Sequence, residues 1–301
     1  MSEKKQLLLV DGMALLFRAF YATAPYGRYM YNDYGVPTNG VYGMLCHLFS
    51  AVKHFQPSHM AVCWDMGKET FRNEIYADYK ANRMEPPEQL VPQFDLAKKA
   101  VQACQIPNIG IVGYEADDCL GTIAKQVKGT AQVTVLTGDR DLLQILDRSV
   151  TVALVKNGFG NYDAYTKERF HEEYGFEPQQ WVDIKAFTGD AADNYPGVKG
   201  IGPKTAEKLI REFATVENVL ASLSELRPNL RQKIEADRDA LVLSKELAMI
   251  NRDVPLQFSL AAAKIDVAAL RNSKRWLKAN IKGTDRIFQI IEEWIDSSFT
   301  S

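Results

Sequence analysis

Short apolar segments alternate with longer amphipathic segments along the first half of the chain. Five apolar segments have the length and composition of buried strands: 6–11, 59–65, 108–113, 132–139 and 150–155. Helical spacing of apolar residues occurs between and after them, over 12–22, 40–55, 92–104, 115–128 and 141–147. Apolar strands separated by helices predict a mainly parallel sheet with helices on both faces. The carboxyl ends of such strands meet at one edge, where open α/β sheets bind their ligands.

Two segments depart from this alternation. Residues 66–91 are rich in charged and aromatic residues, contain Pro86-Pro87, and predict an insertion that projects from the sheet edge. From about residue 178 the strand patterns stop and helical patterns continue to the end. We therefore predict an α/β core over 1–177, with the insertion at about 66–91, and an α-helical lobe over 178–301.

Acidic residues stand where the predicted strands end. Asp11 ends the first strand, Asp65 the second and Asp139 the fourth, while "YEADD" (114–118) follows the third. The complete set of candidates is Asp11, Asp65, Glu115, Asp117, Asp118, Asp139, Asp141, Asp190 and Asp193. A single Asp in such a position is usually a helix cap. A cluster of nine acids, interrupted only by Arg140, would repel itself unless cations neutralised it.

The types of ligand in this set indicate which cation. Carboxylates without His or Cys favour Mg²⁺ or Mn²⁺ over Zn²⁺. Nine carboxylates exceed what one octahedral ion accepts, so we predict two Mg²⁺ ions, with Mn²⁺ able to substitute. Two such ions can bind the attacking and leaving oxygens of a phosphodiester and lower the pKa of water. The set therefore indicates phosphodiester hydrolysis.

"PGVKGIGPKTAEKLI" (196–210) is the most specific local motif. Two glycines predict a tight hairpin, and Pro203 suits the first position of the helix that follows. Glycine amides, a helix N-terminus and lysines together form an anion site, the helix-hairpin-helix pattern that binds nucleic-acid backbone. The predicted contacts are Lys199, Gly200, Ile201, Gly202, Lys204, Thr205 and Lys208. The hairpin carbonyls are also a candidate K⁺ site. An ordinary turn with solvated lysines is the alternative.

The insertion carries "YADYKANR" (76–83), for which we predict a helical stretch. Tyr76 and Tyr79 suit stacking on unpaired bases, and Lys80 and Arg83 suit phosphates or charge that develops at the scissile phosphate. A solvated helix with partly buried lysine and arginine stems is the alternative.

Composition excludes little. The chain has 301 residues, 46% apolar and 25% charged, which is ordinary for a soluble globular protein. The net charge of −2 becomes +7 when the nine acids are set apart (−2 + 9), so it does not exclude a nucleic-acid partner. Four cysteines without CxxC spacing and four scattered histidines indicate buried thiols and structural imidazoles. We expect a cytoplasmic monomer without a membrane segment or organic cofactor.

Several motifs, taken in order over about residues 6–258, resemble the 5′-nuclease (flap endonuclease) family. The motifs are "LLLVDG…FRAFYA", "AVCWD", "FR…YKANR", "YEADD", "TGDRDLLQ", "TGDAADNYPGVKGIGPKTA" and "NRDVP". That family includes the N-terminal domains of bacterial DNA polymerase I and stand-alone 5′–3′ exonucleases. The resemblance implies a PIN-like core with a helical arch, and Mg²⁺-dependent cleavage of DNA at free 5′ ends, flaps or nicks in replication and repair.

The resemblance also implies roles for individual residues. It makes the nine acids metal ligands, Tyr79, Lys80 and Arg83 arch residues, and Phe17 and Arg18 a pair near the metals. No polymerase pattern follows, so the chain resembles the stand-alone enzymes. The tail from about 259 predicts a packed terminal helix without an assigned function.

Three other functions share features of this sequence. A phosphatase of the haloacid dehalogenase type needs a second Asp two residues after the first, and Met13 stands there. A ribonuclease acting on RNA/DNA hybrids would have the same carboxylates, and the hairpin favours duplex DNA over it. A DNA-junction-binding protein that has lost catalysis is the third, and the intact acid set argues against it.

Overall fold

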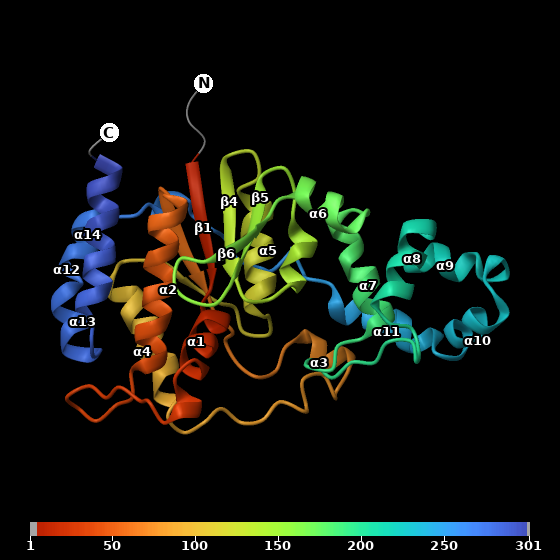
Figure 1. Cartoon of the computed structure of the whole chain (residues 1–301), viewed down its shortest axis with the longest axis horizontal. Helices are drawn as coiled ribbons and strands as arrows, with labels where there is room; N and C mark the ends of the chain where they lie inside the picture. Colours follow the sequence, from red (N-terminus) through yellow and green to blue (C-terminus); the bar gives the residue numbers. More distant parts are fainter. Residues whose placement is uncertain (1–4, 300–301) are drawn as a thin grey trace.

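The computed structural model describes residues 5–299, which form an α/β core and a helical lobe at one end of it (Figure 1). The strands are β1 (Lys5–Asp11), β2 (His59–Cys63), β3 (Asn108–Ile109), β4 (Ala131–Thr137), β5 (Val150–Val155) and β6 (Tyr162–Tyr165). The helices of the core are α1 (Gly12–Tyr21), α2 (Asn39–Phe55), α3 (Phe71–Ile75), α4 (Val91–Ala103), α5 (Ala116–Gln126) and α6 (Lys167–Tyr174). The remaining helices are α7 (Trp181–Thr188), α8 (Pro203–Phe213), α9 (Val216–Ala221), α10 (Pro228–Ala236), α11 (Arg238–Ala248), α12 (Val267–Asn272), α13 (Lys274–Asn280) and α14 (Asp285–Phe299).

The sheet has the strand order β3-β2-β1-β4-β5-β6 and is parallel except for β6. The predicted mainly parallel sheet is therefore confirmed. β1 lies between β2 and β4, with Leu9 beside Ala61 on one side and Val135 on the other. Because these three strands run in the same direction, Asp11, Asp65 and Asp139 all lie at or just beyond the same edge of the sheet.

Apolar side chains fill both faces of the sheet. Leu7, Leu9 and Val135 pack with α5, whereas Leu8 and Val10 pack with α1 and α2. This alternation along β1 is the reason that the strand is apolar throughout, since each face is covered by helices. The four cysteines are buried and free, as the sequence predicts.

The helical lobe consists of α7 to α11, in which α7 packs against both α8 and α11. After α11 the chain returns to the core, where Ile265 N donates to Ser58 O (3.0 Å) and α14 packs along α2. Residues from about 264 therefore belong to the core, at the end of the molecule opposite the lobe (Figure 1). The predicted terminal helix is present as α14. None of the helices within residues 5–299 could cross a membrane.

Two local predictions were wrong. The stretch 76–83 is not helical, because α3 ends at Ile75 and a series of turns follows. Lys80 has a φ of 57°, a left-handed conformation that interrupts a right-handed helix. The segment 141–147 is a short 3-10 helix, Asp141–Ile145, and not an α-helix. At 76–83, hydrogen bonds to residues 191–194 hold the turns in place.

Candidate active site

Four carboxylates lie at the sheet edge without a basic partner, and we call them the rim carboxylates: Asp11, Asp65, Asp117 and Asp139. Asp11 accepts hydrogen bonds from Ala14 N (2.9 Å), which caps α1, and from Thr137 Oγ1 (2.9 Å). Asp65 Oδ1 accepts from Ala116 N (2.7 Å) at the start of α5. Backbone and hydroxyl groups position these acids, and none of the four forms an ion pair within residues 5–299.

Crowding changes the acidity of the rim carboxylates. Burial, and then the charges of Asp65 and Asp139, raise the pKa of Asp11 from 3.8 to about 7. Burial, and then Asp11 and Asp139, raise the pKa of Asp117 well above 3.8. The ionised rim is therefore costly in the protein alone, and bound cations would remove that cost.

This acidity predicts how the metal-free protein responds to pH. Because folded Asp11 keeps its proton up to about pH 7 and an unfolded Asp releases it near 4, the folded state binds more protons in between. The free energy of unfolding should therefore fall as pH rises from about 4 to 7, by on the order of a few kcal/mol. Urea unfolding in chelator measures this. Asp11→Asn should flatten the slope, and an unchanged slope in that variant would contradict the assignment.

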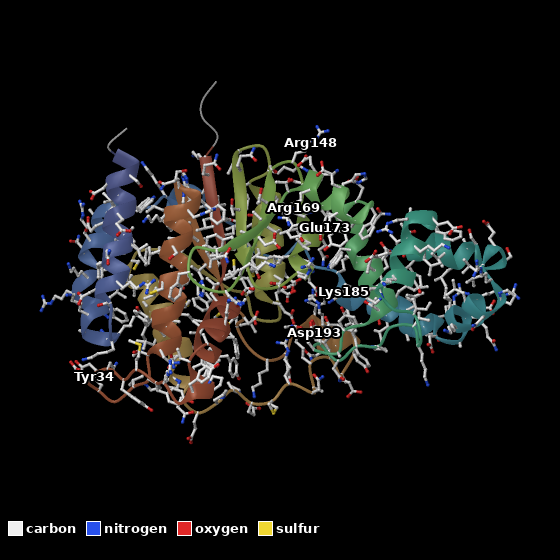
Figure 2. The ribbon with its side chains drawn as sticks, in the orientation of Figure 1. Tyr34, Arg148, Arg169, Glu173, Lys185 and Asp193 are labelled. Carbon is white, nitrogen blue, oxygen red and sulfur yellow. The ribbon has the colours of Figure 1, made fainter. Side chains whose placement is uncertain are left out.

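A second pair of acids shares one lysine. Lys185 Nζ on α7 lies 2.9 Å from Asp141 Oδ1 and 2.5 Å from Asp190 Oδ2, and Figure 2 labels it where the core meets the helical lobe. Burial, and then the charge of Asp139, raise the pKa of Asp141 to about 6 in spite of this lysine. The sequence offered no signal for Lys185, because its position in α7 has no fixed spacing from Asp141.

A third group joins the insertion to the remaining acids. Lys80 Nζ lies 2.6 Å from Glu115 Oε1 and 3.8 Å from Asp193 Oδ2. Arg83 Nη2 lies 2.6 Å from Asp193 Oδ1. Lys80 N also donates to Asp193 O (2.9 Å), which fixes the turn that replaces the predicted helix. The structure therefore brings Lys80 and Arg83 to the acids through turns rather than through the predicted helix.

Tyr79 differs from its predicted role as a stacking platform. Its side chain is only 4% exposed, and its hydroxyl donates to Asp193 (3.1 Å) and more weakly to Glu115 (3.4 Å). The ring packs in a small apolar cluster with Tyr195, Leu247 and, at its margin, the half-buried Tyr76. A ring buried in this way is not available to a nucleic-acid base, so Tyr79 orients acids in this structure.

Asp118 is placed differently from the other predicted ligands. Its side chain is fully buried, and both carboxylate oxygens bind the Arg72 guanidinium at 2.8 and 2.9 Å. It also accepts from Glu115 N (3.1 Å) and Asn251 N (2.8 Å). Four donors occupy this carboxylate, so the geometry gives it no access to an ion at the rim. Arg72 belongs to the motif "FR…YKANR", but nothing in the sequence indicated that its side chain is buried.

The side chains of Phe17 and Arg18, which were predicted as a pair near the metals, face different parts of the molecule. Phe17 lines a cavity of about 370 Å³ together with Asp65, Lys80, Arg83 and Glu115. Arg18 Nη2 instead donates to Asn157 in the β5–β6 loop (3.3 Å). The predicted pair is therefore divided, with only Phe17 facing the space beside the acids.

The hairpin forms between α7 and α8. Gly200 has a φ of 78°, which favours glycine, and α8 begins at Pro203 as expected. Ile201 is buried and anchors the turn, whereas the side chains of Lys199, Lys204 and Lys208 are exposed and Thr205 is half-buried. Lys233, which the sequence did not single out, donates to Gly200 O (3.2 Å). The hairpin thus presents a cationic, exposed surface.

Divalent cations fit this set of donors in chemical type. The rim offers only oxygen ligands, and the buried hydroxyl of Tyr195 has no hydrogen-bond partner within residues 5–299. Burial, and then the charges of Asp141 and Asp190, raise the pKa of this hydroxyl. A buried donor beside acids indicates a missing polar species. Within the same residues, no three acidic, His or Cys side chains already converge as a metal centre does.

Comparison with known proteins identifies the family. The family model described as 5′-3′ exonuclease, N-terminal resolvase-like domain matches residues 6–175, and that of the C-terminal SAM fold matches residues 176–270. A 5′-3′ exonuclease of Bacillus subtilis (strain 168) is 53% identical over 284 residues, or 94% of this chain and 96% of that protein. DNA polymerase I of Bacillus caldotenax is 43% identical over 259 residues, which cover 85% of this chain and 29% of the polymerase.

Solved structures share the fold. T5 5′-exonuclease with bound divalent zinc ions has a TM-score of 0.65 and 24% identity, covering 97% of this chain and 99% of that one. The catalytic core of Rad2 in complex with a DNA substrate has a TM-score of 0.56 and 14% identity, covering 97% and 92%. Together with the two family models, which account for residues 6–270, these similarities confirm the family resemblance: the chain belongs to the 5′-3′ exonuclease family.

Proposed function

We propose that this protein hydrolyses DNA phosphodiesters near 5′ ends, flaps and nicks, acting as a 5′–3′ exonuclease and flap endonuclease with Mg²⁺ bound at the rim. The observation that carries the proposal is a rim of four crowded acids that form no ion pair within residues 5–299, in the same chain as an exposed cationic hairpin. Divalent cations bound by these acids would supply positive charge to phosphate oxygens and lower the pKa of water. The carboxylates best placed to hold them are Asp11, Asp65, Asp117 and Asp139, with Glu115, Asp141, Asp190 and Asp193 around them.

The chain itself supplies the remaining positive charge. Lys80 and Arg83 border the cavity that also contains Asp65 and Phe17. A phosphate in that cavity would lie next to both cations, which can stabilise negative charge as it develops. Phe17 offers an apolar surface for the adjoining base. Lys80 and Arg83 therefore serve as charge-stabilising residues in the proposed reaction.

The hairpin supplies binding rather than chemistry. Exposed lysines at the start of α8 can contact phosphates without reading bases. The proposed K⁺ at this hairpin would share the Gly200 carbonyl with Lys233 Nζ. Rim and hairpin both come from one chain, which supports a monomer as the active form.

A flapped duplex labelled at its 5′ end tests the proposal. With Mg²⁺ the protein should release the flap as one main product or shorten it stepwise, and product lengths separate the two actions. Chelator should abolish both, and Mn²⁺ should restore them. A labelled hybrid with RNA in the cut strand tests the ribonuclease alternative. Junction binding without any cleavage in Mg²⁺ or Mn²⁺ would refute the proposed enzyme.

A paired substitution tests the hairpin. Lys204→Ala combined with Lys208→Ala should weaken duplex binding and reduce the slope of log K against log salt by about 1.8, since each phosphate contact contributes about 0.9. Binding titrations at several salt concentrations measure this slope. Lys278→Ala with Lys282→Ala, on the opposite end of the molecule, is the matched control and should leave it unchanged. An unaltered slope in the hairpin variant would remove α8 from the DNA-binding surface.

A further inference from the structure

Arg72 joins three parts of the chain at one buried point. It lies in α3, at the start of the insertion, and its side chain is only 3% exposed. Its guanidinium binds Asp118 of α5 through two hydrogen bonds, at 2.8 and 2.9 Å. It also donates to the carbonyls of Leu247 (2.9 Å) and Met249 (2.7 Å), at the end of α11. We call Arg72, Asp118 and the backbone of residues 247–251 the joint.

Asp118 contributes further hydrogen bonds to the joint. It accepts from Asn251 N (2.8 Å), just after α11, and from Glu115 N (3.1 Å) at the start of its own helix. The neighbouring residue in α5 is Asp117, a rim carboxylate. Successive side chains on a helix point in different directions, so α5 presents Asp117 to the rim and Asp118 to the helical lobe. Asp118 therefore links the segment after α11, at Asn251, to the turn that carries Glu115 and Asp117.

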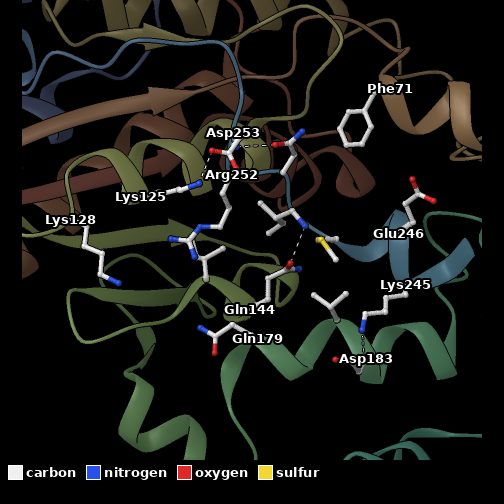
Figure 3. A pocket seen from close by; sticks show the side chains of 15 residues that line it. Phe71, Lys125, Lys128, Gln144, Gln179, Asp183, Lys245, Glu246, Arg252 and Asp253 are labelled. Atoms are coloured by element: carbon white, nitrogen blue, oxygen red, sulfur yellow. Dashed lines mark hydrogen bonds and ion pairs between the residues drawn. The ribbon is translucent and has the colours of Figure 1, made fainter. Parts of the chain in front are cut away.

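The joint is one of several contacts that hold the lobe against the core, together with the Lys185–Asp141 and Arg83–Asp193 ion pairs. A groove of about 790 Å³ separates α5 from α7 and α11 beside the joint, and Figure 3 shows its lining side chains. Beside the joint, α5 therefore does not pack directly against α7 and α11 along the whole interface. Gln144 adds an uncharged tie, bonded to Ala248 O (3.0 Å) and Ile250 N (2.9 Å). At Gly121 a Cβ atom would lie 2.8 Å from Ile250 Cγ2, so the segment after α11 packs directly against α5 at this point.

A buried ion pair is weak evidence of stability, because desolvation offsets most of the attraction. Its fixed geometry, by contrast, specifies a relative position. The path from the joint to the hairpin is short: α11 packs on α7, and α7 packs on α8. The joint therefore contributes to the position of the hairpin lysines relative to Asp117.

We propose that Arg72 and Asp118 are positioning residues that set the distance between the DNA-binding hairpin and the rim carboxylates, and so select which phosphodiester is cut. This inference rests on the proposed function. It also assigns Asp118 to the joint in place of the metal-ligand role predicted from the sequence.

The test uses the full chain with Arg72→Met and Asp118→Leu combined, since apolar residues of similar size commonly replace a buried pair without loss of folding. Arg72→Lys, which keeps the positive charge beside Asp118 but loses the two parallel hydrogen bonds, is assayed in parallel so that a folded variant is available. Lys125→Met with Asp253→Asn is the matched control. That exposed pair (2.6 Å) also joins α5 to the segment after α11, and is drawn in Figure 3.

Two measurements separate the outcomes. Cleavage of the labelled flapped duplex under single-turnover conditions should shift from the wild-type position to neighbouring phosphodiesters in the joint variants, and remain at that position in the control. Thermal unfolding is also measured at increasing Mn²⁺ concentrations without DNA. The Mn²⁺ concentration that gives half of the maximal thermal shift should be the same in the joint variants as in the wild-type protein. Wild-type product lengths from folded joint variants would overturn the inference, as would a roughly tenfold higher Mn²⁺ midpoint, a difference of about 1.4 kcal/mol. Failure of the wild-type protein to cleave would refute the proposed function instead.

Discussion

Asp117→Asn is expected to lower the single-turnover cleavage rate by about three orders of magnitude, since bound cations contribute several kcal/mol to transition-state stabilisation. The same substitution should raise the melting temperature of the metal-free protein. Burial and the charges of Asp11 and Asp139 oppose ionisation of this carboxyl, so a neutral amide relieves repulsion there. Activity and metal-free stability should thus move in opposite directions. Rate measurements in Mg²⁺ and thermal unfolding in chelator check the two effects.

The control for this prediction is Glu172→Gln, which removes an exposed acid from α6, away from the rim. It should change neither the rate nor the metal-free stability beyond the small effects of surface substitutions. If Asp117→Asn cleaved at the wild-type rate, the rim would not be the catalytic centre. A lower melting temperature in chelator would show that Asp117 stabilises the fold, contrary to the electrostatic argument.

Lys80→Ala should reduce the single-turnover rate by about 10²–10³-fold, the usual cost of removing one group that stabilises developing charge. Duplex affinity should change little, because the hairpin provides most of the proposed phosphate contacts. Lys80 is only 19% exposed and reaches both Glu115 and Asp193, so its ammonium is held at the acids. Rates at saturating enzyme and equilibrium binding in Ca²⁺ distinguish chemistry from affinity.

Lys68→Ala provides the comparison within the same insertion. Lys68 also lines the cavity, but its side chain is 77% exposed and pairs with Glu85 at 2.5 Å, so its loss should reduce the rate far less than the loss of Lys80. Equal rates for Lys80→Ala and wild type would restrict Lys80 to a structural role. A large loss of affinity in Lys80→Ala would instead make it a binding residue.

Much of the fold could be predicted because the apolar pattern directly reflects burial. Strand β5 occupies the predicted residues 150–155, and β1, β2 and β4 lie within two residues of prediction. β6 was missed, since Tyr162–Tyr165 is short, half-buried and polar at one position. The segment 76–83 was predicted as helix from spacing alone, whereas hydrogen bonds from Lys80 N to Asp193 O and from Asn82 to Ala191 O hold it in turns. Contacts more than a hundred residues apart leave no local pattern.

The candidate active site could likewise be predicted only in part. Strand ends predicted where Asp11, Asp65 and Asp139 would gather, because parallel strands align their carboxyl ends. Roles that depend on side-chain direction could not be predicted in this way. Asp117 and Asp118 are chemically identical and adjacent, and only the tertiary partner Arg72 separates a rim carboxylate from a joint residue. Lys185, Tyr195 and Lys233 were missed for a related reason: each meets its acids, or its carbonyl, through packing of the helical lobe.

Lys185 has a consequence for the order of events after synthesis. Its single ammonium lies between Asp141 from the core and Asp190 from the segment that precedes the hairpin, and so offers both carboxylates an internal counter-charge. Small zinc domains, in contrast, stay unfolded until their metal arrives. Here the ammonium of Lys185 neutralises Asp141 and Asp190, so that these two acids need no bound cation for the core and the lobe to fold together. Binding of the proposed ion would then be a late, reversible step, separate from folding of the chain.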